Sequence, residues 1–217
     1  MTRLLKVDDS NRSDHWYLTA EDRCYYFYEY TAHKGFAFSK VNSFIANLKK
    51  PPSQRQEGHY RYKGVAIQEA AGLLRGVLNK SPGLLTTATL VPIPPSKPAD
   101  HPDYDDRMEQ VVKEACHGLQ IDARCLIAQD QAYEASHLQG EGGSRIKPAE
   151  LQALYSLVAP KPRGTVILID DVLTTGAHFV AAKAAILAEY PAAQVAGIFL
   201  ARRAIPAPTD DALAIET

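Results

Sequence analysis

The chain has 217 residues, 46% of them hydrophobic, and a formal net charge of −1. This length suits one substantial domain with a buried core, or a core domain with an added lobe. The near-neutral charge excludes a general electrostatic attraction to nucleic acid. No apolar run reaches the roughly 20 residues of a membrane span. The three cysteines lack metal-ligand spacing and are typical of reduced thiols. We therefore expect a cytoplasmic protein with no membrane partner.

The first part of the chain predicts a strand and then a helix. Residues 23–31 are dense in aromatic side chains, which favour strands. A short helix is expected over residues 39–50. Its apolar face would comprise Val41, Phe44, Ile45 and Leu48.

Residues 49–63 predict a linker, because they contain prolines and a glycine but almost no apolar side chains. This segment carries a formal charge of +4. Its basic side chains could contact the backbone of a nucleic acid, and the interleaved Tyr60 and Tyr62 could stack on its bases. A solvated linker is the preferred interpretation, so a nucleic-acid partner is not expected.

Beyond the linker, helical patterns alternate with short apolar stretches. Helices are expected at residues 65–78, 103–119, 148–158 and 177–189. Buried strands are expected at residues 88–91, 124–128, 165–169 and 195–200. Residues 129–147, with several glycines and little apolar content, predict a mobile loop. Apolar strands separated by helices are typical of an α/β fold with a doubly wound, mostly parallel sheet.

The predicted domain organisation has three parts. Residues 1–58 would form a small N-terminal α+β lobe rich in aromatic side chains. This lobe could be a hood over the site, a dimer surface, or an ordinarily packed unit. Residues 59–205 would form the α/β domain, and residues 206–217 a C-terminal tail. A homodimer or a protein partner is therefore compatible with the sequence.

The segment VILIDDVLTTGAH, at residues 166–178, is the most informative part of the sequence. An apolar strand running into an acidic pair is followed by Thr-Thr-Gly and a helix. The amide groups at a helix N-terminus favour a phosphate, and a glycine permits close backbone approach. The upstream carboxylates can accept hydrogen bonds from sugar hydroxyls. The sequence therefore predicts a ribose 5-phosphate site beyond the carboxyl end of a strand.

This segment resembles the signature of the type I phosphoribosyltransferases. Together with VPIPP at residues 91–95 and YRYKGVAIQEAAGLLRGVL at residues 60–78, it makes the chain similar to the competence protein F-like group. The resemblance implies a phosphoribosyltransferase-type fold that binds phosphoribosyl pyrophosphate. It also implies Mg²⁺ held mainly by the ligand, and transfer of phosphoribose to a nitrogen acceptor with release of pyrophosphate. His178 stands where the family commonly has a hydroxyl residue.

The same resemblance implies roles for individual residues. The expected catalytic residues are Asp170, Asp171 and Arg145. The expected ribose 5-phosphate site comprises Asp170, Asp171, Val172, Leu173, Thr174, Thr175, Gly176, Ala177 and His178. The expected diphosphate site comprises Ile93, Pro94, Ser96, Lys97 and Arg107.

Two alternative functions remain open. His178 and the altered sequence after the diphosphate segment favour a sensor that binds a phosphoribosyl ligand without consuming it and controls a partner protein. The +4 segment and the resemblance favour a competence-type accessory that handles DNA.

Overall fold

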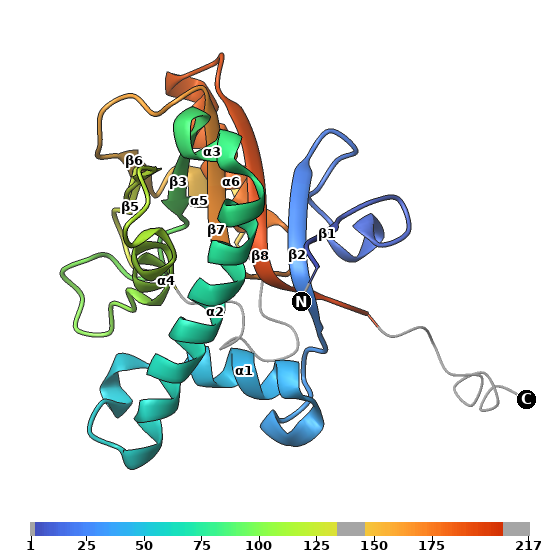
Figure 1. The fold of residues 1–217 in the computed structure, drawn as a ribbon, viewed down its shortest axis with the longest axis vertical. Helices are drawn as coiled ribbons and strands as arrows, with labels where there is room; N and C mark the ends of the chain where they lie inside the picture. Colours follow the sequence, from blue (N-terminus) through green and yellow to red (C-terminus); the bar gives the residue numbers. More distant parts are fainter. Residues whose placement is uncertain (1–2, 134–145, 206–217) are drawn as a thin grey trace, which may run out of the picture.

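A computed structural model describes residues 3–133 and 146–205 (Figure 1). These residues form an α/β structure with a mostly parallel six-stranded sheet in the order β1-β2-β8-β7-β3-β4. Only the pair β1–β2 is antiparallel in this sheet. Its strands are β1 (Leu5–Lys6), β2 (Arg23–Tyr30), β3 (Ala88–Pro92), β4 (Asp122–Ala123), β7 (Thr165–Leu173) and β8 (Gln194–Arg203). A separate antiparallel pair consists of β5 (Ile127–Gln129) and β6 (Tyr155–Leu157).

Helices cover both faces of the sheet (Figure 1). The α-helices are α1 (Lys40–Leu48), α2 (Arg61–Lys80), α3 (Pro82–Thr87), α4 (Arg107–Cys116), α5 (Pro148–Gln152) and α6 (Ala177–Glu189). Short 3-10 helices are η1 (Arg12–Asp14), η2 (Phe36–Phe38), η3 (Pro52–Gln54) and η4 (Gly58–Tyr60). One face packs on α1, α2 and α4, and the other on α5, α6 and the β5–β6 pair. Successive side chains of a strand point to opposite faces of the sheet. Ile167 therefore packs in the core with α1, α2 and α4, and Leu168 in the core with α5 and α6.

The connections from β3 and β7 run in opposite directions. The chain passes from β3 through α4 to β4 on one side, and from β7 through α6 to β8 on the other. Because α4 and α6 cover opposite faces, the two connections diverge at the carboxyl ends of neighbouring strands. This arrangement is compatible with a doubly wound fold. Ligands of such sheets bind in the crevice at this point.

The N-terminal segment shares the main sheet. β2 pairs in parallel with β8 along its whole length, and α1 packs against α2. The sheet therefore crosses the expected boundary at residue 58 between the lobe and the larger domain. Tyr26 and Phe27 of the aromatic strand are buried in opposite cores, so these two side chains pack on the sheet faces instead of forming an exposed surface.

Two predicted elements after residue 120 are wrong. The single strand expected over residues 124–128 is replaced by β4 and β5, which belong to different sheets. The helix expected over residues 148–158 ends at Gln152, because β6 pairs with β5. This pairing buries Ile127 and Tyr155 against α5 and α6. Short apolar runs do not reveal such a pairing, because helix and strand patterns are ambiguous at this length.

Two boundaries and one side chain also differ from prediction. The linker at residues 49–63 contains η3 and η4, and α2 begins within it at Arg61. The helix expected from residue 103 begins at Arg107. Val65, predicted on the apolar face of α2, is 62% exposed, whereas Ile67 and Leu74 are buried as expected.

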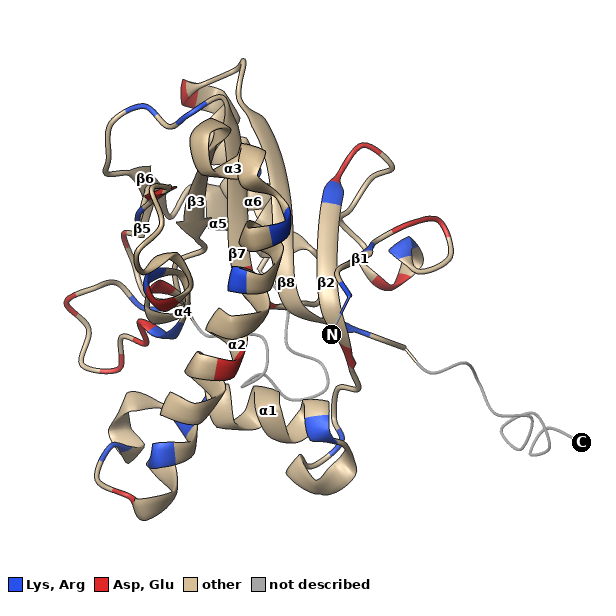
Figure 2. Ribbon diagram, in the orientation of Figure 1, with Lys and Arg blue, Asp and Glu red and all other residues tan. Residues whose placement is uncertain are grey.

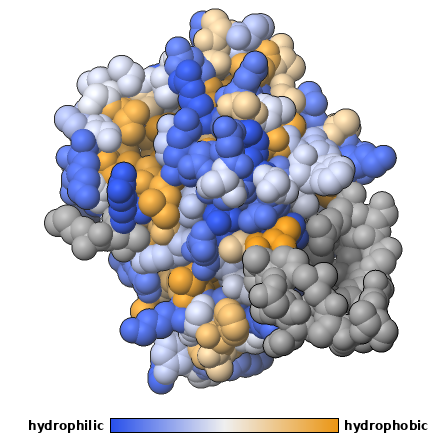
Figure 3. All heavy atoms as spheres, turned by 90° about the vertical axis from the view of Figure 1, so that its right-hand side faces the viewer, coloured by the Kyte–Doolittle hydropathy of each residue, from blue (hydrophilic) through white to orange (hydrophobic). Residues whose placement is uncertain are grey.

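The surface beside β1 and β2 is chemically mixed. Viewed from that side, the described hydrophobic side chains form separate patches between hydrophilic ones (Figure 3). Within residues 3–133 and 146–205, no helix is long and apolar enough to cross a membrane.

Candidate functional site

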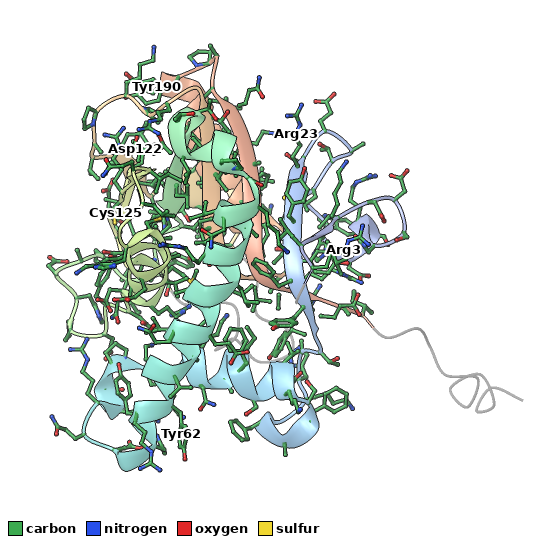
Figure 4. The ribbon with its side chains drawn as sticks, viewed as in Figure 1. Arg3, Arg23, Tyr62, Asp122, Cys125 and Tyr190 are labelled. Carbon is green, nitrogen blue, oxygen red and sulfur yellow. The ribbon has the colours of Figure 1, made fainter. Side chains whose placement is uncertain are left out.

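A cavity of about 330 Å³ lies where the connections after β3 and β7 diverge. This volume falls within the range of about 300–1,000 Å³ that is typical of small-molecule sites. The predicted residues that line the cavity are Ile93, Pro94, Ser96, Lys97, Arg107 and all nine residues from Asp170 to His178. Asp122 and Tyr190 mark the opposite, amino-terminal end of the sheet (Figure 4). Arg145 lies outside the described residues.

The turn between β7 and α6 is shorter than predicted. β7 continues through the acidic pair to Leu173, so Val172 and Leu173 are buried strand residues. Only residues 174–176 connect the strand to the helix. Gly176 is the N-cap of α6 and has a positive φ of 86°, which favours glycine over other residues. The backbone that can cradle a phosphate therefore begins at Thr174.

The two carboxylates of the acidic pair have different surroundings. Asp171 is buried on the α1–α4 side, where Lys49 Nζ lies 3.0 Å and Arg107 Nη2 lies 2.6 Å from its oxygens. Burial alone would raise the pKa of Asp171, but these two cations hold the pKa well below its ordinary value. Burial and the charge of Asp171 raise the pKa of the half-buried Asp170. The pair therefore combines one firmly ionised carboxylate with one that binds a proton more readily.

Asp171 belongs to a chain of buried ion pairs. Lys63 Nζ lies 2.8 Å from Asp105 Oδ2, and Arg107 Nη1 donates to the same oxygen at 2.7 Å. Arg107 then joins Asp105 to Asp171, and Lys49 ends the series. These contacts connect α1, α2, α4 and β7 beside the cavity. Arg107, expected to bind diphosphate, thus has its guanidinium engaged by two carboxylates.

These ion pairs include two lysines of the basic segment at residues 49–63. Figure 2 shows basic residues along the connection between α1 and the start of α2. Two of them, Lys49 and Lys63, are engaged by carboxylates of the site. Lys50 and Arg61 both lie over the ring of Tyr62, at the start of α2 (Figure 4). The segment is therefore partly neutralised, which reduces its capacity for phosphate contacts.

The predicted diphosphate segment offers fewer backbone donors than its length suggests. Ile93 donates its amide to Ile169 O at 2.9 Å, which extends the sheet beyond β3. Pro94 and Pro95 have no amide hydrogen. The backbone donors that this segment can present to the cavity therefore begin at Ser96 and Lys97.

Tyr133 joins the two halves of the cavity and was not predicted. Its amide donates to Ser96 O at 3.1 Å, and its hydroxyl lies 3.0 Å from His178 Nε2. Burial lowers the pKa of His178 to about 4, so the imidazole is neutral at pH 7. The Tyr133 hydroxyl can then donate to Nε2, leaving the proton of the imidazole on Nδ1. The only sequence signal was an aromatic residue within a polar loop.

Replacing Tyr133 with phenylalanine is expected to lower the free energy of unfolding by about 1 kcal/mol, because His178 Nε2 loses its partner. Chemical denaturation of both proteins measures this difference. Tyr155→Phe is the matched control, since the buried Tyr155 hydroxyl has no hydrogen-bond partner among the described residues. Tyr155→Phe should leave stability unchanged or raise it. Equal losses in the two variants would contradict the role of the Tyr133–His178 contact.

No family model matches the chain, and no curated protein matches it significantly.

Proposed function

We propose that this protein binds phosphoribosyl pyrophosphate in the cavity between β3 and β7 and transfers its phosphoribosyl group to a nitrogen acceptor. The proposal includes a phosphoribosyltransferase-type fold. The observation that carries it is the junction of β7 and α6. There, an acidic pair, a turn of three residues and a left-handed Gly176 at a helix N-terminus line one cavity.

Each part of this junction suits one part of the ligand. The amides and hydroxyls of the turn at residues 174–176, together with the positive end of the α6 dipole, would hold the 5-phosphate. Asp170, half-buried in the cavity wall, would accept hydrogen bonds from the ribose hydroxyls. Ser96 and Lys97, on the opposite wall, would hold the diphosphate. Asp171 would act indirectly, because it positions Lys49 and Arg107 beside the cavity.

The reaction would break the bond between the anomeric carbon and the diphosphate oxygen, and the electron pair would leave with pyrophosphate. The lone pair of the acceptor nitrogen would form the new bond to carbon, and that nitrogen would lose a proton. The protein would act mainly by positioning the two reactants and by neutralising the leaving group with cations such as Lys97.

The cavity also has a suitable group for Mg²⁺. Asp170 provides carboxylate oxygens, the hard ligands that Mg²⁺ prefers. A cation there would stabilise the ionised form of Asp170, whose pKa is raised by burial and by the charge of Asp171. Asp170 and the diphosphate of the ligand would hold the ion, and its chemistry would be to neutralise the charge of the leaving pyrophosphate.

The test combines calorimetric titration with phosphoribosyl pyrophosphate and an assay of pyrophosphate release across a panel of nucleobases and amines. We expect binding, and turnover with at least one acceptor. In Asp170→Asn, affinity should fall by tenfold or more, because a charge-assisted hydrogen bond contributes about 1.5–3 kcal/mol.

Asp122→Asn is the control for this substitution. Asp122 is also a partly buried carboxylate, but it pairs with Arg124 and lies at the opposite end of the sheet (Figure 4). Its substitution should leave affinity unchanged. Unchanged affinity in Asp170→Asn, or no binding by the unaltered chain, would refute the proposed site.

One observation favours a second function, that of a sensor. Arg107 is occupied by Asp105 and Asp171, and so is less available to stabilise a leaving diphosphate. Binding of phosphoribosyl pyrophosphate without turnover for any acceptor would support the sensor over the transferase.

A further inference from the structure

A segment near the N-terminus lies directly behind the turn at residues 174–176. His15 Nδ1 is 2.5 Å from Thr174 O, and the Tyr17 amide donates to Thr175 O at 2.9 Å. Since a carbonyl oxygen only accepts, His15 Nδ1 must be the donor. Two successive carbonyls of the turn are therefore bonded by one segment, which we define as the bracing segment, residues 11–18.

These contacts determine the direction of the amides that face the cavity. In a planar trans peptide unit, the carbonyl oxygen and the next amide hydrogen point in opposite directions. Bonding Thr174 O from behind therefore directs the amide of Thr175 forward, and bonding Thr175 O does the same for the amide of Gly176. Residues 174–176 line the cavity, whereas His15 and Tyr17 are not among its lining residues, so the cavity lies on the side of the turn away from the bracing segment.

The bracing segment is itself firmly anchored. Leu18 packs so closely on Gly176 that a Cβ atom there would lie 2.8 Å from Leu18 Cδ2. Just beyond the segment, Asp22 pairs with Lys183 of α6 at 2.7 Å. Within it, Asp14 pairs with Arg202 of β8 at 2.7 Å. The segment is thus attached to α6, which follows the turn, and to β8, which pairs with β7, so it can resist displacement of the turn.

The buried side chain of His15 is more polar than a purely structural role at this position requires. Its side chain is fully buried, and its Nε2 has no hydrogen-bond partner among the described residues. An unpaired buried polar atom costs about 1–3 kcal/mol, which a leucine of similar size would avoid. The contact with Thr174 O is therefore what distinguishes His15 from an apolar core residue at this position.

We propose that His15 is a positioning residue for the 5-phosphate, which it serves by orienting the amides of the turn at residues 174–176. The inference rests on the proposed function, because it requires that this turn binds phosphate. His15 contacts the back of the turn and would not touch the ligand. Its removal would therefore impair recognition of the ribose 5-phosphate half of the ligand and spare recognition of the diphosphate half at Ser96 and Lys97.

The experiment measures the affinity of the full chain for ribose 5-phosphate and, separately, for inorganic pyrophosphate by calorimetry. In His15→Leu, affinity for ribose 5-phosphate should fall about tenfold, which corresponds to about 1.4 kcal/mol. Affinity for pyrophosphate should not change. His15→Asn should retain most of the affinity for ribose 5-phosphate, because its amide nitrogen can donate from near the Nδ1 position.

Circular dichroism and thermal melting would reveal whether His15→Leu misfolds. If it does, a second variant still tests the inference. Leu18→Ala removes the packing on Gly176 but keeps both hydrogen bonds to the turn. Leu18→Ala should also lower the affinity for ribose 5-phosphate and leave the affinity for pyrophosphate unchanged.

An equal loss of affinity for both ligands, or an unchanged affinity for ribose 5-phosphate in a folded His15→Leu, would overturn the inference about His15 but not the proposed function. If the unaltered chain binds neither ribose 5-phosphate nor phosphoribosyl pyrophosphate, the proposed function fails, and the inference with it.

Discussion

Replacing Arg107 with methionine is expected to lower the free energy of unfolding by about 3 kcal/mol. Arg107 is the cation shared by two buried carboxylates, Asp105 and Asp171. Removing one partner of a buried ion pair typically costs about 3–5 kcal/mol. The lower end applies here because Lys63 and Lys49 still neutralise one carboxylate each. Chemical denaturation monitored by circular dichroism measures the loss.

Arg12→Met is the control for this substitution. Arg12 also pairs with an aspartate, but its partner Asp9 is 92% exposed, and such surface pairs contribute about 0–1 kcal/mol. If Arg107→Met loses no more stability than this control, the two lysines suffice, and Arg107 is free to serve the ligand. That result would remove the observation that favours the sensor.

Replacing Gly176 with alanine is expected to reduce the affinity for ribose 5-phosphate more than tenfold. A left-handed conformation costs a residue with a Cβ atom about 1–2 kcal/mol, and the new Cβ would also collide with Leu18. The Leu18 side chain can shift away from the new Cβ atom, but the strain of the left-handed conformation is relieved only by rotation of the peptide units of the turn, which would direct the amides away from the ligand. Calorimetric titration of the purified variant measures the change.

Gly118 provides a close comparison. It also has a positive φ, of 72°, but an added Cβ would meet nothing within 4 Å. Gly118→Ala should therefore lower the free energy of unfolding by a similar backbone contribution and keep its affinity for ribose 5-phosphate. Parallel loss of affinity in both variants would mean that reduced stability, and not the geometry of the turn, controls binding.

The sequence by itself determined the local features of this protein. The aromatic run at residues 23–31 predicted β2, and the apolar stretch before Asp170 predicted most of β7. The helix after Gly176 was also predicted with its correct bounds. These predictions succeeded because each depends on the side-chain pattern of adjacent residues and on one glycine. The placement of the candidate site at the carboxyl end of a central strand followed from them.

Only the tertiary structure decided which distant segments meet at that site. The pairing of β2 with β8 brings residues 11–18 behind the turn after β7, and packing of α1 and α4 surrounds Asp171 with Lys49 and Arg107. His15 and Tyr133 had no recognisable motif, because their partners Thr174 and His178 are far away in the sequence. Composition and periodicity report which face of an element is apolar, but contacts between polar groups depend on how whole elements pack. The residues proposed to contact a ligand were thus chosen from the sequence, whereas the contacts that hold them in place emerged only from the fold.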